Sequence, residues 1–143
     1  MFAKIASHAV ILLLAACAGR EPSFPAEAAG RYQLDYSGVY GVGRVALLLQ
    51  DGQVRGLGAG AGGITYQGFY RWAPDGRLVA LDLIAHLPPF TSAVDGVRVV
   101  GTARDVPVQF ELPPDLAPGA RWPLRIGTQH GPVSGTLTRL DVP

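Results

Sequence analysis

The sequence ITYQGFYRW, residues 64–72, decides the fold class because two kinds of side chain alternate along it. The set that we expect to face the core comprises Ile64, Tyr66, Gly68, Tyr70 and Trp72. Successive side chains of a β-strand point to opposite faces of the sheet, and aromatic residues are enriched in strands. The stretch therefore predicts a β-strand with one core face and one outer face.

Three Asp-Gly pairs divide the chain into regular segments: Asp51-Gly52, Asp75-Gly76 and Asp95-Gly96. This dipeptide favours the type I′ turn of two-residue hairpins, because both central residues adopt positive φ there. The pairs recur about every 20 to 24 residues, which is the length of two strands with their connections. This spacing predicts a meander of antiparallel hairpins.

The segments between these turns carry strand patterns. In Arg77–Leu87 the apolar side chains from Val79 to Leu87 alternate with a second set, and Val106–Leu112 alternates in the same way. Pro107 marks the latter as an edge strand or a strand beside a bulge. Further strands are predicted at Arg31–Tyr36, Gly43–Gln50, Gln53–Gly58, Val97–Thr102, Ala120–Ile126 and Pro132–Leu140.

The strand count predicts the architecture. About eight or nine strands are expected, and no segment has a convincing amphipathic helical pattern. Closing a sheet of this size on itself removes its exposed edges. The sequence therefore predicts an all-β fold, a small antiparallel up-and-down β-barrel of about eight strands.

The N-terminus has the layout of a secretory signal: basic Lys4, an apolar stretch centred on Val10–Ala15, and small residues before Cys17. Leu14-Ala15-Ala16-Cys17 looks like the bacterial lipobox, in which the cysteine is acylated before the leader is removed. The apolar run is shorter than the roughly 20 residues that cross a bilayer. We therefore expect lipidation at Cys17 and a protein anchored in the membrane by its acyl chains.

Three regions follow from this reading: a signal peptide at 1–16, a lipidated cysteine with a flexible tether at 17–30, and one β-barrel domain at 31–143. The tether is predicted because 18–30 is rich in Pro, Ala and charge without an apolar period. Cys17 is the only cysteine, so no disulfide is expected in the domain. Ala18 lacks the Asp of one inner-membrane retention signal, which favours the outer membrane, facing the periplasm.

Composition argues against a nucleic-acid partner. The formal net charge is +1, and Lys4 lies in the predicted leader, so the mature chain would carry only Arg as its cation. No basic stripe or cluster is present for a polyanion or for electrostatic attachment to a membrane. We expect no nucleic-acid binding.

Short glycine-rich elements together resemble the GrlR-like family, named for a negative regulator of type III secretion. They are Gly30-Arg31-Tyr32, Gly41-Val42-Gly43, Asp51–Gly56 and Tyr66–Tyr70, within a similarity that spans roughly Gly30–Ala85. The resemblance implies a lipocalin-like barrel of eight strands with an apolar interior that forms dimers. The named member acts in the cytoplasm through an acidic loop; this chain has an export signal and no acidic cluster at Pro88–Asp95. The regulatory partner is therefore not expected to carry over.

Catalytic and cofactor motifs were weighed against ordinary structural roles. Gly58–Gly63 has the glycine spacing of a dinucleotide loop, but a strand and not a helix is expected after it, so no pyrophosphate site is predicted. The histidines of the mature chain, His86 and His130, lack the spacing of metal ligands. Ser134 has no nucleophile elbow around it. The carboxylates that only folding could bring together are Asp82, Asp105 and Glu111. We expect no enzyme, no cofactor and no metal.

Aromatic residues are the remaining candidates for a binding site. Those expected either to line a cavity for an apolar ligand or to fill the core are Tyr66, Tyr70, Trp72, Phe110 and Trp122. Filling is favoured because eight strands leave room only for side chains or one small ligand. Phe90, after Pro88-Pro89, is a candidate contact for a partner at a loop. Two functions remain open: a non-enzymatic envelope lipoprotein that binds a protein partner or a second copy of itself, or a carrier of a small apolar ligand or lipid.

Overall fold

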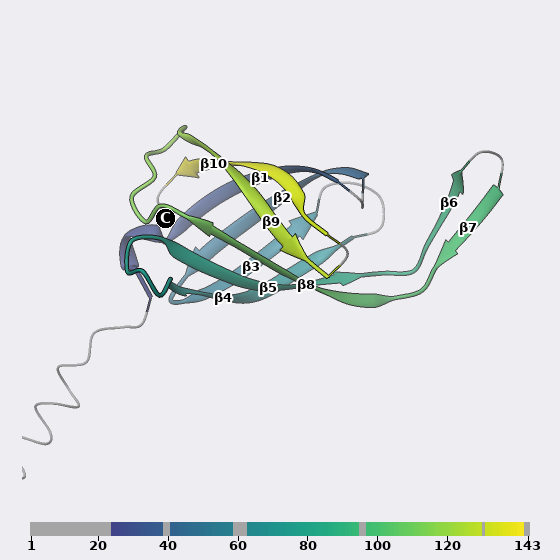
Figure 1. Cartoon of the computed structure of the whole chain (residues 1–143), viewed down its shortest axis with the longest axis horizontal. Coiled ribbons are helices and arrows are strands. Elements are labelled where there is room, and N and C mark those ends of the chain that lie inside the picture. Colours follow the sequence, from purple (N-terminus) through teal and green to yellow (C-terminus); the bar gives the residue numbers. More distant parts are fainter. Residues whose placement is uncertain (1–23, 39–40, 59–62, 95–96, 130, 142–143) are drawn as a thin grey trace, which may run out of the picture.

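The computed structural model describes residues 24–38, 41–58, 63–94, 97–129 and 131–141 (Figure 1). These residues form strands and one short 3₁₀ turn. The elements in chain order are η1 (Ala26–Ala28), β1 (Gly30–Gly38), β2 (Gly41–Gln50), β3 (Gln53–Gly58), β4 (Thr65–Trp72), β5 (Val79–Leu87), β6 (Phe90–Val94), β7 (Val97–Gly101), β8 (Arg104–Leu112), β9 (Arg121–Thr128) and β10 (Val133–Asp141).

Eight strands close into a barrel in the order β1-β10-β9-β8-β5-β4-β3-β2. Every neighbouring pair is antiparallel, and β1 closes the ring by pairing with both β2 and β10. The predicted all-β, up-and-down barrel is therefore confirmed, in an arrangement compatible with a lipocalin-like fold. The other two strands, β6 and β7, form a separate two-stranded sheet between β5 and β8. We call this hairpin the β6–β7 arm; Figure 1 shows it extending beyond one end of the barrel.

The predicted turns differ in type. Asp51 and Gly52 have φ of 52° and 78°, and Gln50 pairs with Gln53 on either side, as expected for type I′. At the second Asp-Gly pair only Gly76 has positive φ, because Pro74 starts a longer connection there. The Gly76 amide donates to the Ala73 carbonyl, and the Ala73 amide donates to the Leu78 carbonyl. The third pair lies at 95–96, outside the described residues.

The connection at Asp75 is stabilised by its own side chain. Its carboxylate accepts hydrogen bonds from the backbone amides of Arg77 at 2.9 Å and Leu78 at 3.2 Å. These bonds favour the ionised carboxylate and hold the pKa of Asp75 below its ordinary value. Asp75 therefore closes this turn by accepting hydrogen bonds, without the positive φ that the dipeptide suggested.

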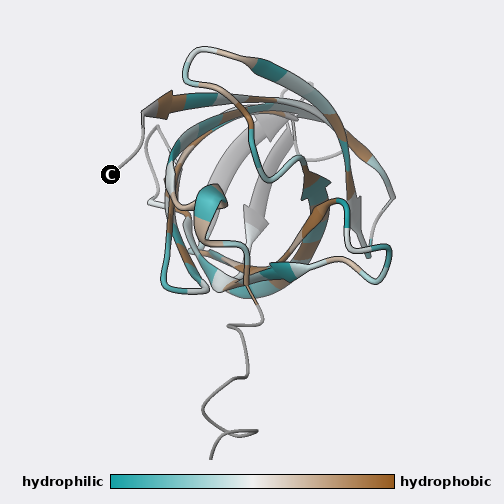
Figure 2. Cartoon of the chain, turned by 90° about the vertical axis from the view of Figure 1, so that its left-hand side faces the viewer, coloured by the Kyte–Doolittle hydropathy of each residue, from teal (hydrophilic) through white to brown (hydrophobic). Residues whose placement is uncertain are grey.

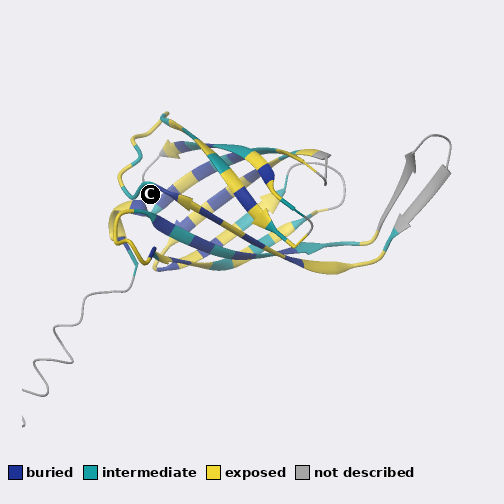
Figure 3. Ribbon diagram, viewed as in Figure 1, coloured by how far each residue is buried: buried dark blue, intermediate teal, exposed yellow. Residues whose placement is uncertain are grey.

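Side-chain alternation fills the barrel. Figure 3 shows buried and outer positions alternating along the strands, and Figure 2 shows the ring end-on. The two faces predicted for β4 and β5 are the observed ones, with Tyr70 and Leu81 inside and Phe69 outside. The largest fully buried side chains are Tyr32, Tyr70, Leu49, Leu81, Leu112 and Leu137. Close-packed interiors of this kind give a barrel of eight strands its core.

The seam between β8 and β9 is the shortest pairing of the barrel. Its register consists of Val108 opposite Thr128 and Gln109 opposite Gly127. Pro107 lies beyond the last paired residue of β9, where its missing amide hydrogen removes no bond to that strand. β8 is not the edge strand that Pro107 predicted, because it pairs with both β5 and β9 in the closed barrel.

The N-terminal segment, residues 24–29, closes one end of the barrel; this part of the tether predicted at 17–30 is folded, and residues 17–23 lie outside the described residues. Ala28 is fully buried, and the Phe24 ring lies against Tyr70 with 5.6 Å between ring centroids. Figure 2 shows η1 lying across the barrel opening. Phe24, Pro25 and Ala28 pack this segment against the barrel, although it has no apolar period. Gly30 already belongs to β1.

Candidate functional site

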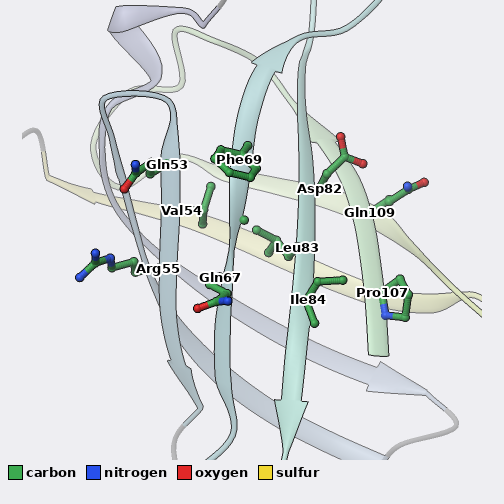
Figure 4. A pocket seen from close by; sticks show the side chains of 11 residues that line it. Gln53, Val54, Arg55, Gln67, Phe69, Asp82, Leu83, Ile84, Pro107 and Gln109 are labelled. Carbon is green, nitrogen blue, oxygen red and sulfur yellow. The ribbon is translucent and has the colours of Figure 1, made fainter. Parts of the chain in front are cut away.

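A groove crosses the outer face of the barrel over β3, β4, β5 and β8 (Figure 4). Its two walls are cross-strand rows, set by the register of these strands. The first wall is the row Gln53, Phe69, Asp82 and Gln109, and the second is the row Arg55, Gln67, Ile84 and Pro107. We call this feature the transverse groove.

The floor of the transverse groove is bare backbone. The row between the walls consists of Val54, Gly68 and Leu83, and side chains at these positions are directed into the barrel. The groove has a volume of about 500 Å³. Residues two apart on a strand are about 6.7 Å apart, which sets the spacing of the walls. Four strands about 4.8 Å apart give the groove a length of about 14 Å.

The groove lining is mainly apolar, with amide side chains and two ionisable groups of opposite charge, Arg55 and Asp82, along its walls. Asp82 is paired with Arg71, whose Nη2 is 3.1 Å from a carboxylate oxygen of Asp82. Phe69 is 66% exposed, the most exposed aromatic side chain among the large hydrophobics of the described residues. Among the described residues, the side chains of Gln53, Arg55, Gln67 and Gln109 form no hydrogen bond or ion pair. The walls therefore offer unused amide donors and acceptors beside an open aromatic face.

The five aromatic candidates all occupy inward positions of the barrel. Tyr70 and Phe110 are buried at 2% and 4% exposure, and both flank Leu81 in one cross-strand row. Tyr66, Trp72 and Trp122 are half-buried. Within the described part of the chain, the ring of Tyr70 contacts Phe24 and not another of the five. The aromatics thus contribute to a filled interior rather than surround an open one.

Tyr66 lies near the opposite end of the barrel from η1. Burial is the main cause that raises the pKa of Tyr66 strongly, and a hydrogen bond with Tyr36 adds to it. Tyr36 in turn lies over Gly43, its cross-strand neighbour, so closely that a side chain at Gly43 would overlap the Tyr36 ring. The two tyrosines therefore close the interior at this end.

A buried arginine, Arg139, links the segments that meet at the end of the barrel closed by residues 24–29. Arg139 is 4% exposed, and its guanidinium donates to the carbonyls of Leu116, Glu27 and Ala29 at 2.9, 3.0 and 2.7 Å. It also lies 5.4 Å from the ring centroid of Tyr32. These bonds tie the N-terminal segment and the loop after β8 to β10.

The hydroxyls of Tyr32 and Tyr70, which both lie in this region, differ in their hydrogen bonding. The Tyr32 hydroxyl donates to the Ala28 carbonyl at 2.7 Å, and burial raises the pKa of Tyr32. The Tyr70 hydroxyl and the Arg139 Nε are buried without a hydrogen-bond partner among the described residues. Sequence patterns could not reveal this cluster, because its members come from η1, β1, β4 and β10.

A second hollow lies at the rim near the β6–β7 arm, where β5 and β8 leave the barrel. His86 Nδ1 is 2.6 Å from an Asp105 carboxylate oxygen across this pair of strands. A histidine oriented by a carboxylate needs a nucleophile or substrate on its other nitrogen to act in catalysis. Thr65 is the next residue in that cross-strand row, but it forms no hydrogen bond with His86 in the described structure. The pair is therefore a hydrogen-bonded contact at the surface without a catalytic constellation among the described residues.

Other predicted sites lie partly outside the described residues. This holds for Cys17, His130 and most of Gly58–Gly63. Phe90 starts β6 and is not part of a loop; its side chain is not described. Within the described chain, no three His, Cys, Asp or Glu side chains lie close enough to hold a metal ion.

No helix in the described ranges has the length and apolarity needed to span a membrane. Comparisons with protein-family models, curated proteins and solved structures found no match to this chain.

Proposed function

We propose that this protein is a non-enzymatic lipoprotein of the bacterial cell envelope that scaffolds a protein partner at the membrane surface. The lipobox motif at Leu14–Cys17 supports an acyl anchor. The observed eight-stranded meander agrees with the barrel that the resemblance to the GrlR-like family implied. Membership in that family is part of the proposal.

The filled interior is the observation that carries this choice. Tyr32, Tyr70 and Leu112 are among the side chains that occupy the barrel axis at 2% exposure or less. An apolar ligand the size of a lipid tail would need a cavity of about 300 Å³ or more. The two hollows described above open on the outer surface instead. Binding on the outside is therefore favoured over carriage of an apolar ligand inside.

The β6–β7 arm is the part that we expect to contact the partner. It lies at the end of the barrel opposite the N-terminal segment, so it would point away from a membrane-bound Cys17 (Figure 1). An isolated two-stranded sheet is marginally stable in water, and its unpaired strand edges are ready to pair with another chain. A partner strand that pairs with the edge of the arm would therefore increase the stability of the arm.

Anchoring is tested by Cys17→Ser. In cells that express the variant, the protein should move from the membrane fraction to the soluble fraction, while the wild type stays membrane-bound. An Ala18→Ser variant, which leaves the cysteine in place, is the control. A Cys17→Ser protein that remains membrane-bound would refute the acyl anchor.

Partner binding is tested by removing the arm. Leu87 and Arg104 are paired in the register of β5 and β8, so Asn-Gly in place of residues 88–103 should close a type I′ hairpin and leave the barrel intact. Crosslinking in intact cells should trap a partner with the wild type and lose it with the shortened protein. Equal crosslinking of both proteins would show that the arm is not the contact, and a wild type trapped only as monomer would contradict the scaffold function.

A further inference from the structure

We propose that the transverse groove binds a glycan, a chain of neutral sugar units. This site is separate from the arm and does not depend on the identity of the protein partner. Three properties of the groove carry the proposal: its shape, its charge and its mixture of amide and aromatic side chains (Figure 4).

Shape restricts the ligand to a thin chain. The Cα atoms of the two walls are about 6.7 Å apart, so the space between their side chains is narrower than this, whereas an α-helix with its side chains is about 10–12 Å wide. A helix would therefore rest on the walls without reaching the floor. The groove runs across the strands, and their backbone groups are already paired within the sheet. A peptide strand consequently finds no free sheet edge there, which removes the main source of affinity for strand addition.

Charge argues against polyanions and charged lipid headgroups. Arg55 and Asp82 are the ionisable groups that line the groove, and they carry opposite charges. Asp82 is moreover held by Arg71 at 3.1 Å. A nucleic acid would require several cations in a row to replace its counterions. With Asp82 paired to Arg71, Arg55 is the one cation left in the lining among the described residues. A single cation does not meet that requirement, which favours a neutral ligand.

The side chains match the two surfaces of a sugar ring. The amides of Gln53, Gln67 and Gln109 each supply two donor hydrogens and an acceptor oxygen, the complement of hydroxyl groups, which both donate and accept. A pyranose also has a face of C–H groups with partial positive charge. The Phe69 ring, 66% exposed at one wall, offers the negative face on which such a surface stacks.

The arrangement of these groups sets a mode of binding. Phe69 is flanked by Gln53 and Asp82 in the first wall, and Gln67 faces them from the second wall. A ring stacked on Phe69 would therefore have hydrogen-bonding groups along both of its edges. With a length of about 14 Å, the groove holds a short run of linked rings, so affinity should rise with oligosaccharide length until the groove is filled.

The test is calorimetric titration of the full chain, purified in a detergent without a sugar headgroup. The probes are an N-acetylglucosamine hexamer, a glucose hexamer linked β-1,4, and a Gly-Ser peptide of similar length. We expect at least one hexamer to bind and the corresponding monosaccharide to bind far more weakly. If neither hexamer binds, or if the peptide binds as tightly as the better hexamer, the proposal is wrong.

Variants locate the site. Phe69→Ala should lower the affinity for the hexamer that binds more tightly about tenfold. Gln67→Ala should lower the same affinity about fivefold. Leu140→Ala is the matched control, because Leu140 is an exposed apolar side chain on β10, outside the groove. All three positions are on outer faces, so circular dichroism should show an unchanged barrel. Unchanged affinity in Phe69→Ala, or an equal loss in Leu140→Ala, would overturn the assignment.

Discussion

Two buried tyrosines in the barrel interior differ in whether their hydroxyl groups form a hydrogen bond. Tyr32 and Tyr70 are both almost completely buried, yet the Tyr32 hydroxyl has an acceptor and the Tyr70 hydroxyl has none among the described residues. A buried polar group without a partner costs about 1–3 kcal/mol, whereas a made hydrogen bond contributes about 1 kcal/mol. The two tyrosines should therefore respond in opposite ways to loss of the hydroxyl.

Tyr70→Phe should leave the free energy of unfolding unchanged or raise it by about 1 kcal/mol, because the orphaned hydroxyl is removed. Tyr32→Phe should lower it by about 1 kcal/mol, because the bond to the Ala28 carbonyl is lost. Urea unfolding of both variants measures the difference. A clear loss of stability in Tyr70→Phe would mean that its hydroxyl has a partner, such as an ordered water.

Tyr66 sets the response to alkali. Burial raises the pKa of Tyr66 above its ordinary value of 10.0, so the folded state keeps the phenol proton at a pH where the unfolded chain has released it. The stabilisation is fully present below about pH 10 and is lost as the pH rises further. Unfolding midpoints from pH 8 to 12 should fall less steeply for Tyr66→Phe than for the wild type. Parallel curves would contradict the raised pKa.

At the scale of elements, the register of β4 and β5 depends on a glycine. A Cβ added at Gly68 would overlap the Asp82 carbonyl oxygen of β5. The missing side chain therefore permits the close approach of the two strands below the transverse groove. The sequence placed Gly68 on the core face of a strand, but the neighbour that requires it is visible only in the folded pairing.

Gly68→Ala should destabilise the barrel by about 2–3 kcal/mol, because the two backbones must move apart. Gly127→Ala is the control: Gly127 also lies in a strand, and an added Cβ there would make an ordinary 3.8 Å contact with the Gln109 carbonyl. Thermal and urea unfolding of both variants measure the effect. Equal stability of the two variants would show that the approach at Gly68 is not tight.

At the scale of the whole molecule, the N-terminal segment is part of the folded unit and not only a connection to it. Phe24 packs on Tyr70, Ala28 is fully buried, and the Glu27 and Ala29 carbonyls accept hydrogen bonds from Arg139. Removing these acceptors leaves a buried guanidinium with incomplete partners, which costs about 3–5 kcal/mol. The plug therefore links barrel stability to the residues next to the proposed anchor.

A chain that begins at Arg31 should consequently unfold with about 3–5 kcal/mol less stability than one that begins at Phe24. The shorter chain lacks only Gly30, the first residue of β1, from the barrel strands, so the comparison isolates the N-terminal segment. Denaturant unfolding of the two proteins provides the measurement. Stability that is equal within error would contradict a structural role for residues 24–30.

Local sequence patterns were sufficient to predict the fold class and the two faces of the strands. Period-two alternation in Ile64–Trp72 and Val106–Leu112 is a local property of an extended chain, and the positive φ of Asp51-Gly52 is a local property of its dipeptide. These patterns can be recognised without knowing which strands lie next to each other in the fold. Cys17 stays a prediction from its motif alone.

Contacts between residues on different strands could be identified only in the folded barrel. Residues far apart in sequence form the groove walls and the contact between His86 and Asp105. The same is true of the hydrogen bond from Arg139 to the Ala29 carbonyl. The separation of the β6–β7 arm from the barrel was likewise invisible, because its strand pattern equals that of a barrel strand. Strand register, barrel closure and the packing of the N-terminal segment all depend on how much apolar surface the assembled sheet buries. A local sequence pattern does not contain that information.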